Sequence, residues 1–126
     1  MRYEAVRFNN GSVELLDSRK LPLVETYVKC RTPKDIFLAI SEMKVRGAPA
    51  IGIAGAFGVY LGAARSKAKT VSGLKRDIKK VSDLLASSRP TARNLFWALE
   101  RMRRVYEMSP AKTAPALVKD LLRESM

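Results

Sequence analysis

The chain has 126 residues, of which 47% are hydrophobic and 29% are charged, a balance typical of one globular domain and unlike that of a disordered chain. It carries one cysteine and no histidine, which excludes an internal disulfide, a cysteine-based metal cluster and the common zinc sites, and we expect neither a metal nor a cofactor. The formal net charge of +12 invites an acidic partner, such as nucleic acid, a membrane surface or a phosphorylated small molecule.

The first third of the chain predicts a small antiparallel sheet. Residues 3–8 alternate between apolar and polar side chains, as in a strand with one buried face. Asn10-Gly11 is a strong signal for a two-residue hairpin turn, because both residues tolerate a positive φ, and residues 13–15 then form the return strand. After a loop at residues 17–22, residues 24–30 alternate again, which predicts a third strand.

Helical signals replace the alternation after residue 31. Thr32 is a good N-cap, Pro33 suits the first helical position, and Asp35 lies in the first turn, where the helix dipole favours a negative charge. Four more helices are expected near residues 49–66, 71–86, from 90 or 91 to beyond 106, and 111–124. The expected fold is a mostly helical α+β domain, in which a small N-terminal antiparallel sheet is followed by a bundle of about five helices.

Most of these helices have an apolar stripe that is expected to face the core. The predicted core residues are Ile36, Ala39, Ile40 and Met43 in the first helix, Val71, Leu74, Ile78, Val81 and Leu85 in the third, Ala92, Leu95, Leu99, Met102 and Tyr106 in the fourth, and Ala114, Leu117, Val118, Leu121 and Leu122 in the fifth. The second helix is different, because residues 48–64 carry no charge at all. That length lies at the lower edge for a membrane span. We expect a core helix surrounded by the other four, with glycines at positions 52, 55, 58 and 62 allowing close approach.

Basic residues are densest in and before the third predicted helix, at Lys67, Lys69, Lys75, Arg76, Lys79 and Lys80. Such a run is typical of a solvated helix face. The chain lacks a known nucleic-acid-binding motif, and its aromatic residues fall mostly at core positions. We therefore expect neither nucleic acid nor a membrane among its partners.

The segment Arg46-Gly47-Ala48-Pro49 precedes the most apolar helix. Gly47 has no Cβ, so its backbone can turn tightly and come close to a ligand. The first N–H groups of a helix have no partner within the helix and carry the positive end of its dipole. Arg46 adds a fixed charge and a planar fork of hydrogen-bond donors. Together these features predict a site for a phosphate or a carboxylate.

A second segment, Arg89-Pro90-Thr91, repeats this arrangement at the start of the fourth predicted helix, with Arg93 and Asn94 in the first turn. Two cationic helix starts can converge on one anionic ligand. The alternative is structural, with Arg46 and Arg89 pairing with carboxylates or capping the C-termini of neighbouring helices. The residues by themselves leave both interpretations open.

Two longer runs carry a resemblance to a known family. Residues 43–54 (MKVRGAPAIGIA) resemble the signature of methylthioribose-1-phosphate isomerases, the enzymes of methionine salvage, and residues 89–99 (RPTARNLFWAL) resemble their second N-terminal motif. Segments at residues 16–22 and 27–32 are also similar to the opening of that family. The same superfamily includes ribose-1,5-bisphosphate isomerases and the regulatory subunits of the guanine nucleotide exchange complex of translation initiation.

The resemblance implies that the sugar phosphate is contacted by Arg46, Gly47, Ala48 and Arg89. It also implies a helical N-terminal domain, followed by a larger Rossmann-like domain that holds a catalytic cysteine and aspartate. No part of residues 1–126 matches that second domain, so we expect a single N-terminal domain without a catalytic residue of its own. Cys30 falls on the inward face of a strand, where we expect a buried structural thiol. The last predicted helix reaches the end of the chain without a stop signal, which is typical of one part of a larger protein, and a complete small domain is the alternative.

The function expected from the resemblance is phosphate binding in an aldose–ketose isomerase of 5-methylthioribose 1-phosphate, with the isolated chain inactive. The expected partners are the sugar phosphate and the chain's own missing C-terminal domain, and a homodimer is expected for the full-length protein. A cytoplasmic location fits the single cysteine. The alternative is a non-catalytic regulatory subunit similar to the translation initiation exchange factor, which a cysteine and an aspartate at the family's positions beyond residue 126 would argue against.

Overall fold

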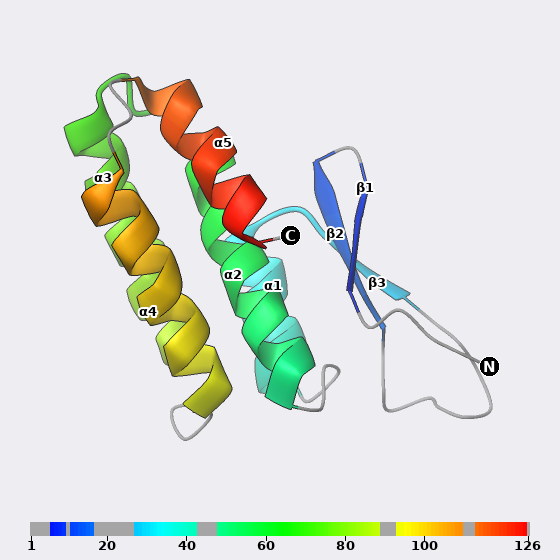
Figure 1. The fold of residues 1–126 in the computed structure, drawn as a ribbon. Coiled ribbons are helices and arrows are strands. Elements are labelled where there is room, and N and C mark those ends of the chain that lie inside the picture. The colour runs from blue at the N-terminus through cyan, green and yellow to red at the C-terminus, as the bar shows by residue number, and fades with distance from the viewer. Residues whose placement is uncertain are drawn as a thin grey trace, which may run out of the picture.

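A computed structural model describes residues 6–9, 11–16, 27–42, 48–88, 93–109 and 113–125 of the chain. These residues form a three-stranded antiparallel sheet that lies beside a bundle of five helices (Figure 1). The elements are β1 (Val6–Asn9), β2 (Ser12–Leu16), β3 (Tyr27–Cys30), α1 (Pro33–Ser41), α2 (Ala48–Arg65), α3 (Val71–Ala86), α4 (Arg93–Met108) and α5 (Ala114–Ser125). The predicted α+β, mostly helical fold is therefore confirmed.

The sheet has the strand order β1-β2-β3, and the predicted hairpin joins its first two strands. Asn9 pairs with Ser12, so two residues connect the strands, and the second of them, Gly11, has a φ of 80°. Such a φ favours glycine because a Cβ would be strained there. The predicted loop at residues 17–22 and the outer parts of the first and third predicted strands, residues 3–5 and 24–26, lie outside the described residues.

The inner face of the sheet packs against the bundle. Val13 and Leu15 of β2 are fully buried, and so is Cys30 of β3, which confirms the expected buried thiol. The ring of Phe8 stacks on Phe57 of α2, with centroids 5.8 Å apart. This aromatic contact and the aliphatic side chains of β2 attach the sheet to the bundle.

Helix α1 begins with the predicted cap. The Thr32 hydroxyl accepts a hydrogen bond from the Asp35 N–H at 3.2 Å, while the Asp35 carboxylate accepts one from the Thr32 N–H at 3.2 Å. This reciprocal pair is a capping box, and Pro33 occupies the first turn as predicted. Ile36, Ala39 and Ile40 are buried as predicted, whereas Met43 lies outside the described residues.

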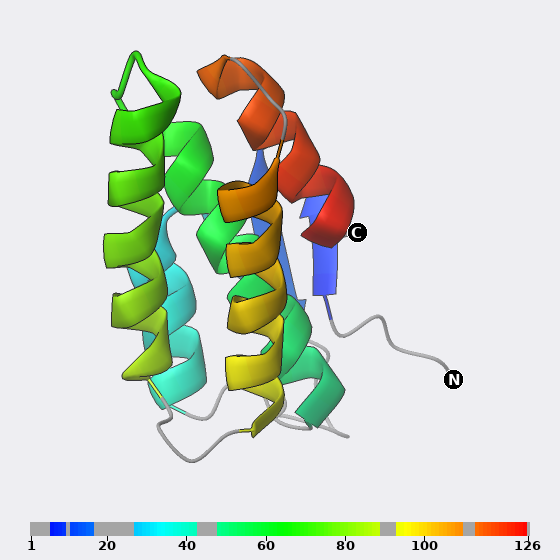
Figure 2. The same cartoon turned by 60° about the vertical axis from the view of Figure 1, so that its left-hand side comes forward.

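Helix α2 lies at the centre of the bundle and packs against each of the other four helices (Figure 2). Its glycines make this close packing possible. A Cβ added at Gly55 would lie 2.5 Å from a Leu95 methyl carbon of α4, and one added at Gly62 would lie 2.6 Å from a Val81 methyl carbon of α3. The expected central helix is thus confirmed. In the described part of the chain, none of the helices combines the length and apolar character of a membrane span.

The three remaining helices carry most of the predicted stripes. Buried residues are Leu74, Ile78 and Leu85 in α3, Leu95, Leu99, Met102 and Tyr106 in α4, and Leu117 and Leu121 in α5, while Val71, Val81, Ala114, Val118 and Leu122 are half-buried. The last helix, expected near residues 111–124, is α5, which begins at Ala114 and ends at Ser125. Thr113 precedes it and accepts a hydrogen bond from the Ala116 N–H at 3.3 Å, as a helix cap does. The predicted start of α4 at residue 90 or 91 and the predicted core residue Ala92 lie outside the described residues.

Candidate functional site

Helices α2 and α4 begin at the same end of the bundle and run in the same direction (Figures 1 and 2). The second turn of α2 lies against the first turn of α4, since a Cβ added at Gly52 would lie 3.1 Å from the backbone oxygen of Asn94. The two helices that follow the predicted cationic segments are therefore neighbours at their N-terminal ends. The sequence alone did not establish this proximity.

The structure describes only some of the predicted site residues at this end of the bundle. Ala48 is the first residue of α2, and its backbone therefore lies at the helix N-terminus. Arg46, Gly47 and Arg89 lie outside the described residues, so their predicted contacts stay predictions. Arg93, predicted to lie in the first turn of its helix, is the first residue of α4 and is exposed.

The electrostatics of this end favour an anion. Neither α2 nor α4 has an acidic residue in its first turn, so no carboxylate there offsets the positive end of either dipole. Helix α1 is different, because its capping box places Asp35 against the backbone N–H groups of Thr32 and Arg31. Burial alone would raise the pKa of Asp35, but these hydrogen bonds and the charge of Arg65 together lower it.

A groove leads away from the contact between Gly52 and Asn94, between α2 and α4, toward the end of α5. It has a volume of about 340 Å³. Its apolar lining consists of Gly52, Ile53, Ala56, Trp97, Ala98 and Met102, and its polar lining of Asn94, Arg101, Glu124 and Ser125. Trp97 is 68% exposed and Ile53 is 43% exposed, so two large apolar side chains of this groove face solvent.

The far end of the groove is closed by contacts from α5. The Ser125 hydroxyl donates a hydrogen bond to the backbone oxygen of Ala56 in α2 at 3.2 Å and is buried. Glu124 forms an ion pair with Arg101 of α4. The groove is therefore apolar along its length, with the helix starts at one end and a paired charge at the other.

This groove is the part of the site that sequence reasoning missed. We expected the aromatic residues mostly at core positions, yet Phe96 and Trp97 are exposed. The signal was present in the helical spacing, because Leu95, Leu99 and Met102 define the buried stripe of α4 and residues 96 and 97 fall off it. An exposed tryptophan next to the stripe of an amphipathic helix needs an explanation beyond core packing.

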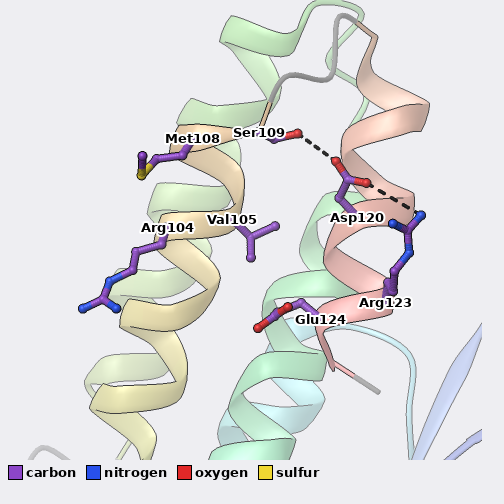
Figure 3. Close-up of a pocket in the computed structure, with 7 residues that line it drawn as sticks. All are labelled: Arg104, Val105, Met108, Ser109, Asp120, Arg123 and Glu124. Carbon is purple, nitrogen blue, oxygen red and sulfur yellow. Dashed lines mark hydrogen bonds and ion pairs between the residues drawn. The ribbon is translucent and has the colours of Figure 1, made fainter.

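A second pocket, between the ends of α4 and α5, is less suited to an anion (Figure 3). It is lined by two acidic residues, Asp120 and Glu124. Asp120 accepts a hydrogen bond from Ser109 at 2.7 Å and lies 3.9 Å from the guanidinium of Arg123, and Glu124 pairs with Arg101. These polar groups thus satisfy one another. The pocket lies at the C-terminal end of α4, away from the helix starts.

The basic stretch in and before α3 is largely a solvated surface, as predicted. Arg76, Lys79 and Lys80 are exposed on the helix, and Lys67 and Lys69 are exposed in the segment before it. Helix α3 runs opposite to α4, so the C-terminal end of α3 lies at the end of the bundle where α2 and α4 begin (Figure 2). The cations of this stretch are therefore separate from the pair of helix starts.

Comparison with known proteins identifies relatives that act on sugar phosphates. The chain is 46% identical over 111 residues to a 5-deoxyribose 1-phosphate isomerase of Petrotoga mobilis, covering 88% of this chain and 32% of that protein. It is 46% identical over 106 residues to a methylthioribose-1-phosphate isomerase of Thermotoga maritima, covering 84% of this chain and 30% of that protein. The chain thus spans about a third of the length of these relatives.

Two crystal structures share the fold. A 5-methylthioribose 1-phosphate isomerase from Pyrococcus horikoshii OT3 matches with a TM-score of 0.89 at 36% identity, over 96% of this chain and 34% of that chain. The delta subunit of translation initiation factor eIF-2B from A. fulgidus matches with a TM-score of 0.87 at 36% identity, over 96% of this chain and 35% of that chain.

The resemblance predicted from the two sequence motifs is confirmed by these relatives, which carry both of the functional names that it implied. The pattern of the Initiation factor 2 subunit family matches residues 44–125, a span that includes both cationic segments and all helices from α2 to α5. The chain belongs to the Initiation factor 2 subunit family.

Proposed function

We propose that the chain is the phosphate-binding domain of an aldose–ketose isomerase that acts on 5-methylthioribose 1-phosphate in methionine salvage. The observation that carries this proposal is that α2 and α4 begin at the same end of the bundle and are in contact near their starts, at Gly52 and Asn94. Each of these helices follows a sequence segment with an arginine, Arg46 before α2 and Arg89 before α4. Two helix dipoles and two guanidinium groups suit a phosphate dianion.

The chemistry needs more than this binding site. The phosphate of an aldose 1-phosphate blocks the anomeric carbon, so the ring must open before a proton moves between C2 and C1. The bond between C1 and the ring oxygen breaks and that oxygen takes up a proton, while hydrogen moves from C2 to C1 and the C2 hydroxyl gives up its proton to become a carbonyl. This exchange needs an acid and a base in a water-poor pocket. We infer that Arg46, Gly47, Ala48 and Arg89 hold and orient the phosphate. A second domain, of the kind that the longer relatives have room for, supplies the acid and the base.

We further infer the setting in which this domain works. The chain spans about a third of its relatives' length, which leaves room for a second domain. We infer that the full-length protein is a homodimer. The cytoplasm is the compartment that suits a free cysteine such as Cys30, which is buried.

A non-catalytic regulatory subunit is the second candidate. It is favoured by the structural match to the delta subunit of eIF-2B at a TM-score of 0.87. A regulatory subunit acts through contact with another protein and has no need to retain a sugar-phosphate site. Binding of 5-methylthioribose 1-phosphate at the helix starts separates the two candidates.

The test is a calorimetric titration of the 126-residue chain with inorganic phosphate and with 5-methylthioribose 1-phosphate. Replacement of Arg46 or Arg89 by alanine is expected to weaken the binding of both ligands by about 1.5–3 kcal/mol, the value of a hydrogen bond to a charged group. Arg76→Ala is the matched control, because it removes the same charge from an exposed position on α3. Equal affinities of the Arg46→Ala variant and the unchanged chain would refute the proposed clamp.

A further inference from the structure

We propose that the groove between α2 and α4 is the subsite for the apolar end of the sugar phosphate, with Ile53 and Trp97 as the residues that select a substituent without a 5-hydroxyl group. This assignment rests on the proposed function, because it takes the phosphate to be held at the helix starts. The assignment concerns the end of the sugar that lies opposite the phosphate, and it names the side chains that recognise that end.

The position of the groove fits the length of such a ligand. The groove begins where Gly52 meets Asn94, next to the first turns of the two helices. Ile53 lies five residues after Ala48 and Trp97 four residues after Arg93, which corresponds to about 6–8 Å along the helix axes. The carbon chain of an open pentose spans about 7–8 Å from phosphorus to C5, since each bond is about 1.5 Å long and advances somewhat less. A phosphate at the helix starts therefore places C5 beside these two side chains.

The lining of the groove fits the chemistry of that end. Six of its ten lining residues are apolar, and its volume of about 340 Å³ lies in the range of small-molecule sites. A methylthio or a methyl group makes no hydrogen bonds and gains free energy when it leaves water for such a surface. The methionine sulfur of Met102 and the ring of Trp97 are soft, polarisable contacts for a thioether. A 5-hydroxyl group in the same place would lose water, and the polar side chains at the far end of the groove are already engaged, Arg101 with Glu124 and Ser125 with the backbone of Ala56.

The exposure of the two side chains supports a ligand over core packing. Trp97 is 68% exposed and Ile53 is 43% exposed, although each has buried residues close by along its helix. Ligand binding would cover them, while the Arg101–Glu124 ion pair and the buried Ser125 close the far end of the groove. The groove is thus limited in length at the end that α5 provides.

Trp97 provides a direct readout, because it is the one tryptophan in the sequence. The experiment titrates the 126-residue chain with inorganic phosphate, ribose 1-phosphate and 5-methylthioribose 1-phosphate, and follows both heat and tryptophan emission. We expect all three ligands to bind. 5-Methylthioribose 1-phosphate is expected to bind about tenfold more tightly than ribose 1-phosphate, as burial of a group of this size predicts, and to shift the emission of Trp97 to shorter wavelength.

Two variants locate the effect. Ile53→Ser is expected to abolish the preference for the methylthio sugar and to leave the affinity for inorganic phosphate unchanged. Phe96→Ser is the matched control, since Phe96 is an apolar residue of α4 with 43% exposure that lies outside this groove. A milder variant, Ile53→Thr, keeps the side-chain volume close to that of valine and is expected to lose part of the preference. If Ile53→Ser also lowers the affinity for inorganic phosphate, the result for Ile53→Thr decides whether Ile53 contributes to the preference for the methylthio sugar.

The outcomes separate the two proposals. If ribose 1-phosphate binds as tightly as the methylthio sugar and neither moves the Trp97 emission, the groove assignment is wrong while the phosphate clamp stands. If none of the three ligands binds, the proposed function fails and the groove assignment fails with it. An emission maximum that changes with protein concentration in the absence of ligand would instead assign the groove to a second copy of the chain and overturn the subsite.

Discussion

At the residue scale, the start of α1 shows how far single positions can be interpreted from the sequence. Thr32, Pro33 and Asp35 are predicted to be the cap, the first helical position and the first-turn acid, and the structure has all three in these places. Local backbone geometry alone decides such a motif, because its hydrogen bonds join residues that are three positions apart. Trp97 was not predicted as a site residue, because its exposure depends on what neighbouring helices leave uncovered.

The capping box has a measurable contribution to stability. Thr32→Ala is expected to lower the free energy of unfolding by about 1 kcal/mol, the usual cost of losing an N-cap. Denaturation in urea at neutral pH measures this value. Ser72→Ala is the control, because it removes an exposed hydroxyl from the first turn of α3 and is expected to have little effect. Equal losses in the two variants would mean that the Thr32 cap adds nothing specific.

Asp35 also makes stability depend on pH. Its pKa in the folded chain is below the ordinary value of 3.8, so the unfolded state binds the proton more strongly than the folded state does. The stabilisation is therefore present above pH 3.8 and is lost as the pH falls through the lowered pKa. Asp35→Asn should remove this part of the acid dependence, and a stability difference between variant and wild type that stayed constant down to low pH would contradict the assignment.

At the element scale, the pattern of small residues in α2 predicted its central position, while the contact made by each glycine emerged from the fold. At Gly55 an added Cβ would lie 2.5 Å from one methyl carbon of Leu95. The nearest atom of any other residue is a methyl carbon of Leu99, at 3.8 Å. At Gly62 it would meet three atoms of Val81, including the Cβ at 3.1 Å. The first neighbour can rotate away, whereas the second is fixed close to the backbone of α3.

These contacts predict different results for the same substitution. Gly55→Ala is expected to be close to neutral, because a helix propensity gain of about 1 kcal/mol offsets the small rearrangement of Leu95. Gly62→Ala is expected to be destabilising, because overpacking against Val81 costs about 1–3 kcal/mol and exceeds that gain. Thermal unfolding of the two variants side by side tests the difference. Equal melting temperatures would mean that α3 moves away from α2 without cost.

At the scale of the whole molecule, the parallel placement of α2 and α4 is the arrangement on which the proposed function depends. Helices that are far apart in sequence begin at one end of the bundle because α3 between them runs in the opposite direction (Figure 2). The bundle thereby brings the first residues of α2 and α4 to one end, and the proposed function adds that the segments with Arg46 and Arg89 meet there as well. Neither segment has this property alone.

The same scale gives a prediction about activity. The 126-residue chain is expected to bind 5-methylthioribose 1-phosphate without converting it to the ketose, because the acid and the base of the reaction are inferred to lie in a second domain. Following the substrate and the ketose product by phosphorus NMR measures this directly. Detectable turnover by the purified chain would show that its own residues suffice and would overturn the division of labour.

The local features of this protein could be predicted from its residues: the hairpin at Gly11, the capping box of α1, the helical stripes and the family motifs. Each of these depends on residues within a few positions of one another, so short-range geometry and periodicity suffice. The contact between α2 and α4 at Gly52 and Asn94, and the groove that exposes Trp97, became visible in the folded chain alone. Both depend on how helices pack across a long stretch of intervening chain, which the glycines of α2 permit and the side chains of α3, α4 and α5 complete.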